Sequence, residues 1–104
     1  MKRTEIASLH RSFAEMDGQQ VTVCGWVKTI RDSKAIGFIE LGDGSCFKSV
    51  QVVFEAEKLD NYKEVSHFGV GAAIVVTGTV VVTPGAKQPY EIHAENIQLE
   101  GASS

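Results

Sequence analysis

The sequence predicts an all-β fold, a five-stranded Greek-key barrel with one helix before it and a short helix between its third and fourth strands. Three features of the 104-residue chain lead to this prediction. Apolar and polar residues alternate with a period of two over most of the chain, and valine is abundant in its longest apolar run. Two short segments instead repeat their apolar residues every three or four positions, as amphipathic helices do.

The first predicted helix belongs to an N-terminal extension of the barrel. Thr4 can cap this helix, and Asp17 and Gly18 end it. Its apolar stripe consists of Ile6, Leu9, Phe13 and Met16. A second, shorter helix is predicted at residues 61–68, where Tyr62, Val65 and Phe68 lie on one side. We expect the first helix to pack on the barrel and the second to close its open end.

Five segments have the pattern of strands: residues 20–31, 35–42, 48–55, 73–83 and 90–99. Gly25 is expected to mark a bend or bulge in the first strand. In the last strand the inward-facing parity changes near Glu95 and Asn96, which predicts a bulge there. The order of strands and helices is that of an OB-fold, whose second and third strands bind oligonucleotides.

The second and third strands are the predicted binding face. Their apolar residues alternate with a mixed set that includes Phe38 and Gln51, so both of these side chains should point to solvent. A hairpin centred between Gly44 and Ser45 would place Phe38 directly opposite Gln51. An exposed aromatic ring beside an amide suggests base recognition. Trp26 is instead expected to have a packing role.

The net charge of −3 is unfavourable for a nucleic-acid-binding protein, because lysine and arginine normally supply most of the affinity for phosphate. The charge is uneven: residues 1–27 are neutral, residues 52–104 carry −4, and residues 28–51 carry +1. The cations of the middle segment, which we expect to contribute to RNA binding, are Lys28, Arg31, Lys34 and Lys48. We therefore expect weak affinity from this chain alone and selectivity from base contacts.

Composition and length indicate one domain over residues 1–104, which we divide into a helical extension at 1–18, a barrel at 19–100 and a linker-like tail at 101–104. With 43% hydrophobic and 22% charged residues, the composition is that of an ordinary globular protein. The longest apolar run is too short for a membrane helix, and the N-terminus lacks the apolar stretch of a signal peptide. We expect a cytoplasmic protein without a membrane partner.

Metal and catalytic chemistry are not predicted. Cys24 and Cys46 form no CxxC pair, and we expect them to be free thiols. The histidines, His10, His67 and His93, are dispersed and have neither metal-ligand spacing nor a catalytic partner. We therefore expect no catalytic residue, no metal and no cofactor in this chain.

An ordered series of motifs runs from residue 21 to residue 54: GWV, then RDSK, the phenylalanine of IGFIEL, DGS and VQVV. The closing segment, YEIHAENIQLEG, continues the series. Together these motifs are much more specific than any one of them, and they cover essentially the whole chain. The sequence resembles the N-terminal anticodon-binding domains of bacterial asparaginyl-tRNA synthetases, and it is more distantly similar to those of the aspartyl enzymes.

The resemblance implies that the barrel holds the splayed anticodon loop of asparagine tRNA. It implies that Phe38 stacks on the central uracil, that Gln51 hydrogen-bonds the same base, and that Arg31 contacts phosphate or base. Glu91 matches an acidic residue of the closing strand near the anticodon in relatives. One position departs from the family: many relatives have an arginine where this chain has Ile30, which weakens the expected phosphate contact.

The family pattern also implies a much longer parent enzyme with a separate catalytic domain. We therefore expect this chain not to aminoacylate tRNA, and we expect tRNA and the parent's catalytic domain to be its partners. It is either a domain excised from such an enzyme or a freestanding relative, and the ending GASS favours excision. The sequence leaves the oligomeric state open.

Two other functions fit the same barrel. A general single-strand-binding domain would bind unrelated oligonucleotides about equally and with strong salt dependence, but the scarcity of basic residues argues against it. A protein-interaction module would use the outward face to contact protein, which the acidic remainder of the chain allows.

Overall fold

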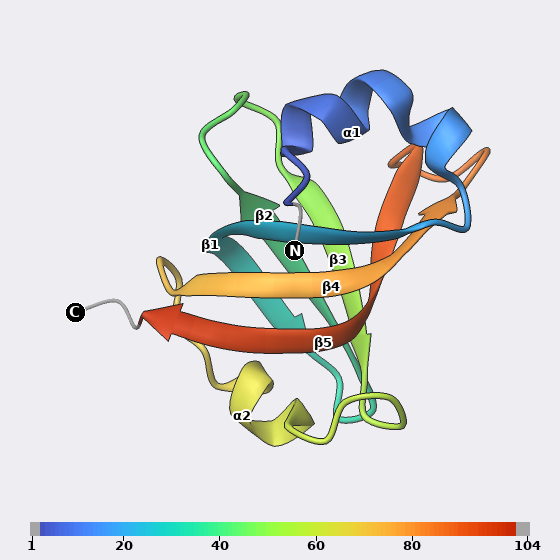
Figure 1. Cartoon of the computed structure of the whole chain (residues 1–104). Helices are drawn as coiled ribbons and strands as arrows, with labels where there is room; N and C mark the ends of the chain where they lie inside the picture. The colour runs from blue at the N-terminus through green and yellow to red at the C-terminus, as the bar shows by residue number, and fades with distance from the viewer. Residues whose placement is uncertain (1–2, 102–104) are drawn as a thin grey trace.

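Five strands close into one barrel in the computed structural model, which describes residues 3–101 (Figure 1). The strands are β1 (Gln20–Asp32), β2 (Ile36–Gly42), β3 (Val50–Glu55), β4 (Ala73–Val82) and β5 (Tyr90–Gly101). Their order around the barrel is β1-β2-β3-β5-β4. Neighbouring strands are antiparallel except β3 and β5, which are parallel. The predicted all-β, five-stranded barrel is confirmed.

The inward-facing residues fill the barrel, as the period-two pattern requires. Phe54, Tyr90 and the aliphatic residues around them are at most 2% exposed. The barrel's hydrophobic core includes Val21, Val23, Val27, Ile39, Leu41, Val52, Phe54, Ile74, Val76, Val80, Tyr90, Ile92 and Ile97. The mixed side of each strand is left on the outer surface.

Register shifts interrupt the pairing of the described strands at Lys28, Glu95 and Glu100. Thr77 pairs with Asn96 and the next residue, Gly78, pairs with Ala94, so Glu95 is the extra residue of the predicted bulge. The expected bulge at Gly25 is wrong, because the register of β1 shifts at Lys28 instead. Gly25 is needed for a different reason: a Cβ there would lie 2.2 Å from the carbonyl oxygen of Gly42, so the two backbones approach too closely for any side chain.

A helix lies across one end of the barrel (Figure 1). It consists of α1 (Ile6–Ser12) and the 3₁₀ turn η1 (Phe13–Met16), and it buries Ile6 and Leu9. The predicted cap at Thr4 is wrong, because the N-cap position is Glu5 and no side chain caps the helix from there. The β2–β3 loop takes over this role: Asp43 accepts from the N–H of Ile6 at 2.8 Å.

Ser45 completes this cap, since its hydroxyl oxygen accepts from the N–H of Ala7 at 3.0 Å. Asp43 also accepts from the N–H of Ser45 at 2.9 Å and from its hydroxyl at 2.6 Å. Burial alone would raise the pKa of Asp43, but these bonds and the bond from Ile6 together hold it below its ordinary value. Asp43 therefore fastens the β2–β3 loop to the helix as an ionised carboxylate.

The opposite end of the barrel is covered by α2 (Tyr62–Ser66), which is shorter than the predicted helix (Figure 1). Tyr62 and Val65 are its buried residues. The Tyr62 hydroxyl donates to Asp32, and burial together with this bond raises the pKa of Tyr62 to about 12. Asp32 also accepts from the N–H of Lys34, which has the left-handed φ of 76°. The β1–β2 turn is thus tied to α2.

The proposed tail falls largely outside the described residues. Gly101 is the last residue of β5, whereas residues 102–104 lie outside the described part of the chain, as do residues 1 and 2 of the extension. Within residues 3–101, no helix has the length and apolar character needed to span a membrane.

Candidate nucleic-acid interface

The outer face of four adjacent strands carries two rows of side chains. The pairing of β1, β2, β3 and β5 defines the first, which we call the Phe38 row: Arg31, Phe38, Val53 and His93. The second row lies two positions away along each strand. We call it the Gln51 row, and it consists of Thr29, Glu40, Gln51 and Glu91. The structure therefore brings four of the predicted site residues, Arg31, Phe38, Gln51 and Glu91, onto one continuous face.

The predicted pairing of Phe38 with Gln51 is wrong by two residues. Phe38 lies opposite Val53, and Gln51 lies opposite Glu40, so Phe38 and Gln51 are diagonal neighbours on the same face. Side chains in this relation are about 7–8 Å apart, within the width of one base. The centre of the hairpin thus lies one residue further along the chain than predicted, in the loop that caps α1.

Phe38 lies outside the core and is partly buried by its neighbours. Val53, in the middle of the row, is only 6% exposed, although it faces outward. The guanidinium carbon of Arg31 lies 5.3 Å from the centre of the Phe38 ring, which is a cation–π contact. The Phe38 ring therefore has Val53 as its cross-strand neighbour and a cation over it.

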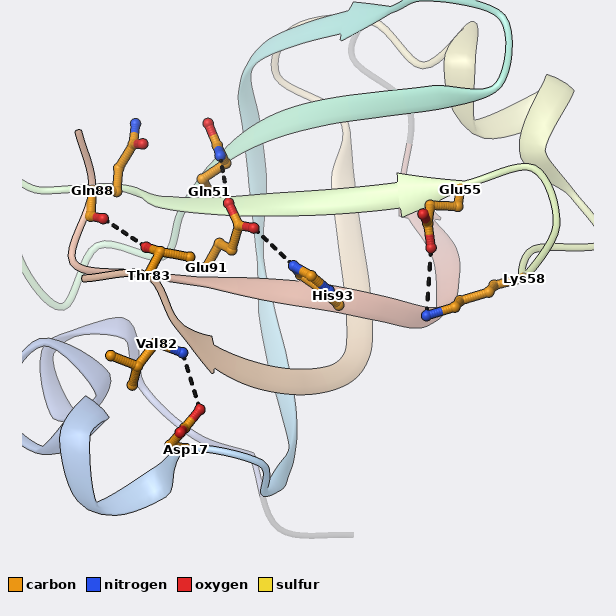
Figure 2. Close-up of polar contacts among 9 residues, drawn as sticks. All are labelled: Asp17, Gln51, Glu55, Lys58, Val82, Thr83, Gln88, Glu91 and His93. Atoms are coloured by element: carbon orange, nitrogen blue, oxygen red, sulfur yellow. Dashed lines mark hydrogen bonds and ion pairs between the residues drawn. The ribbon is translucent and has the colours of Figure 1, made fainter. Parts of the chain in front are cut away.

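Gln51 belongs to a short polar network that Figure 2 shows in full. Its amide nitrogen donates to Glu91 Oε2 at 2.9 Å, and Glu91 Oε1 lies 2.8 Å from His93 Nε2. The amide nitrogen is thereby directed at Glu91, and the amide oxygen points away from it (Figure 2). An oxygen held in this way accepts a hydrogen bond from a ligand placed over the face.

The three lysines of the predicted site do not form one cluster. Lys34 is in the β1–β2 turn and lines a cavity with residues of α2, at one end of the barrel. Lys48 is at the other end, where it lines a groove with residues of α1. Lys28 is the bulged residue of β1, and its Nζ lies 3.5 Å from the carbonyl oxygen of Phe47. Lys48 therefore lies in the β2–β3 loop, Lys28 contacts the same loop, and Lys34 is apart from them.

Some residues of this surface were not found from the sequence. His93 alternates with the inward residues Ile92 and Ala94, and this parity would have placed it beside Glu91. Phe47 gave no signal, because it lies in a loop, yet its side chain is 100% exposed. Trp26 packs only at the surface: the indole is 41% exposed and lies close to Gly42 and Gly44 on the outside of the barrel.

The remaining candidates for chemistry show no reactive arrangement. Cys24 and Cys46 are free thiols, as expected. His10 lies 3.0 Å from the Tyr90 hydroxyl, and His67 lies 2.6 Å from the carbonyl oxygen of Lys63. Among residues 3–101 there is no group of three or more His, Cys, Asp or Glu side chains arranged to hold a metal ion.

Comparison with known proteins assigns the chain to a family. The chain is 53% identical, over its whole length, to asparagine–tRNA ligase of Acetivibrio thermocellus, and 54% identical over 103 residues to that of Bacillus cereus. It spans 22% of the length of each of these relatives. These matches confirm the resemblance to asparaginyl-tRNA synthetases on which the sequence analysis relied.

Solved structures agree on the fold. Asparaginyl-tRNA synthetase from Pyrococcus horikoshii matches with a TM-score of 0.86 and 22% sequence identity, covering 100% of this chain and 23% of that one. The profile of the tRNA anticodon family, described as OB-fold nucleic acid binding domains, matches residues 21–100. Those residues include every predicted site residue and all five strands except Gln20, the first residue of β1, and Gly101, the last residue of β5. The chain therefore belongs to the family of OB-fold nucleic acid binding domains.

Proposed function

We propose that the chain is the noncatalytic part of an asparaginyl-tRNA synthetase that recognises the anticodon loop of asparagine tRNA. The observation that carries this proposal is the joint placement of Phe38 and Gln51 on one outer face, with the Gln51 amide oriented by Glu91. The chain spans about a fifth of the length of its relatives, so catalysis is assigned to the rest of the parent enzyme.

Phe38 is the stacking platform in this proposal. A phenyl ring on the outer face adds little to the hydrophobic core, whereas a flat ring offers the face of any base a contact of about 1–3 kcal/mol. Val53 supports the ring from its own row. The guanidinium of Arg31, already beside the ring, is placed to pair with the phosphate of the stacked nucleotide.

Gln51 supplies the selectivity. Uracil presents an N–H donor between two carbonyl acceptors, and the outward-pointing amide oxygen of Gln51 matches that donor. Cytosine has an unprotonated nitrogen at this position, and it would repel the same oxygen. Glu91 prevents the amide from turning over, because its carboxylate accepts only a donor.

The test is a titration of labelled anticodon stem-loops, with the central uracil present or replaced, against the wild-type chain and Phe38→Ala. We expect Phe38→Ala to raise Kd for the matched loop by roughly 5- to 150-fold, which corresponds to about 1–3 kcal/mol. Phe38→Tyr keeps the aromatic face and should bind almost normally. An unchanged Kd for Phe38→Ala would refute the stacking site. Equal affinity for all loops would instead indicate general single-strand binding.

A further inference from the structure

His93 holds the far end of the polar network that orients Gln51 (Figure 2). Its Nε2 lies 2.8 Å from Glu91 Oε1, while the other carboxylate oxygen, Oε2, accepts from the Gln51 amide at 2.9 Å. Each oxygen of this carboxylate therefore has its own partner. Because a carboxylate only accepts hydrogen bonds, the proton of the first bond belongs to Nε2, and the imidazole is the donor.

The backbone at His93 is fixed by a strand on each side. His93 pairs with Val53 of β3 and with Thr79 of β4. A Cβ on Gly78 of β4 would lie 2.5 Å from the carbonyl oxygen of His93, so the two backbones are in close contact. Glu91 and His93 are two residues apart on β5, which places both side chains on the outer face. The imidazole therefore projects toward Glu91 from a rigid part of the sheet.

The bond between His93 and Glu91 is partly shielded from water, since the side chains are 33% and 20% exposed. A hydrogen bond to a charged group is stronger in such a place than in open solvent. Two other charged residues, Lys58 and Glu95, line the same hollow as His93. Lys58 lies 3.4 Å from Glu55, and Glu95 accepts two hydrogen bonds from other side chains. Of these charged groups, Glu91 is the one that His93 contacts.

Glu91 needs the second partner because its own side chain is flexible. A glutamate side chain rotates about several bonds, and a partner at one oxygen alone leaves the carboxylate free to turn or to swing into solvent. Once Glu91 lets go, the Gln51 amide can turn over and present its nitrogen where its oxygen was. A nitrogen donor at that place matches the unprotonated ring nitrogen of cytosine and no longer matches the N–H of uracil.

We propose that His93 is a positioning residue for base selection, which holds Glu91 in place so that Gln51 presents its oxygen to the central uracil. The inference rests on the proposed function and adds to it a residue that need not touch the RNA. Because His93 acts through Glu91, its loss should change the choice between uracil and cytosine more than the strength of binding.

The test is the ratio of the Kd for a stem-loop with cytosine at the central position to the Kd for the loop with uracil. We expect His93→Ala to lower this ratio by about 2- to 5-fold, at or below the contribution of one hydrogen bond. His93→Gln keeps an N–H that can reach Glu91, and it should restore the ratio. His67→Ala, which removes an exposed histidine at the end of α2, is the matched control and should keep the ratio.

The path of the effect is tested by a double variant. If His93 acts through Glu91, then Glu91→Gln should lower the same ratio, and adding His93→Ala to it should cause no further loss. An additional loss in the double variant would show that His93 acts by another route, and the inference would be wrong.

The orientation of the amide is also tested without RNA, by NMR of the side-chain NH₂ group of Gln51 in the 104-residue chain. We expect His93→Ala to move these signals toward those of a mobile, solvent-exposed glutamine, because the bond to Glu91 is lost for part of the time. His93→Gln should leave them close to the wild-type positions. Unchanged signals in His93→Ala would show that Glu91 holds the amide without help from His93.

The outcomes separate this inference from the function on which it rests. A ratio that Gln51→Ala lowers but His93→Ala leaves unchanged would overturn the role of His93 alone. Equal Kd values for the two loops in the wild type would overturn the proposed function, and this inference with it. Equal losses for both loops in His93→Ala that His93→Gln does not restore would indicate that His93 only stabilises the fold, and the inference would be wrong.

Discussion

The base-reading face, which carries the Phe38 and Gln51 rows, and the groove that Lys48 and Lys87 line share Gln51 but differ in charge. The Gln51 row places Glu40 and Glu91 on either side of the amide, whereas the groove has Lys48 and Lys87 on its walls. Carboxylates beside a base edge repel phosphate, and they allow close approach only to a ligand that offers the right hydrogen-bond donors. The difference teaches that the carboxylates and the lysines of this small surface lie in neighbouring but separate parts of it.

The largest effect is expected from removing both aromatic rings. Phe38 lies on the face, and Phe47 lines the groove. If the two rings hold different bases, the losses of Phe38→Ala and Phe47→Ala should add in the double variant, to roughly 2–6 kcal/mol. Both rings lie outside the core, so the double variant should keep its circular dichroism spectrum. A double variant that binds no more weakly than Phe38→Ala would show that the two regions do not act separately.

The second prediction concerns a variant that releases the β2–β3 loop from α1 and leaves the base-reading face unchanged. Asp43→Ala removes the acceptor for the N–H of Ile6 and the two bonds from Ser45, and we expect it to lower the free energy of unfolding by about 1–2 kcal/mol. Urea unfolding measures this loss, and Asp60→Ala, at an exposed position, is the control. In the Asp43→Ala background, Phe47→Ala should no longer change RNA affinity, although Phe38→Ala still should.

A smaller effect is expected on base preference, and it tests whether Gln51 reads the central base. Gln51→Ala should reduce the preference for uracil over cytosine at the central position by about 0.5–1.5 kcal/mol, the usual contribution of one hydrogen bond. The salt slope should stay as in the wild type, because no cation is removed. Competition titrations with the two stem-loops give the preference. A uniform loss for both loops would place Gln51 outside base recognition.

The smallest effect concerns pH and the attachment of the β2–β3 loop. The pKa of Asp43 is lower in the folded chain than in the unfolded one, where it is about 3.9. The ionised carboxylate therefore stabilises the fold above that pH, and this contribution is lost as the pH falls through the folded pKa. The difference in unfolding free energy between the wild type and Asp43→Asn should be constant from pH 5 to 7 and shrink below about pH 4.

Period-two patterning was sufficient to predict the barrel, and the parity change near Glu95 was sufficient to predict its bulge. Both follow from which side of a strand must be apolar, and this is visible in the local sequence. The pattern also predicts that Phe38 and Gln51 lie on the outside, for the same reason. Their roles in RNA recognition stay predictions.

The errors have a different origin. The cap of α1 is supplied by Asp43, which bonds to Ile6 across 37 positions of the chain and lies in the same loop where the β2–β3 register differs from the prediction. Local propensity favoured Thr4 as the cap and a tight turn at Gly44, and a contact between distant segments replaced both. The groove was missed for a similar reason, since Lys48 and Lys87 meet only when the β2–β3 loop and the β4–β5 loop meet.

Strand β2, which bears Phe38, is anchored at both ends: Asp32 joins the turn before it to Tyr62, and Asp43 joins the loop after it to Ile6. A strand fastened in this way has little freedom left to lose when a nucleotide settles on it. The entropy penalty of complex formation then falls almost entirely on the RNA. Stem-loops whose anticodon bases are already unstacked in solution should consequently be the favoured ligands.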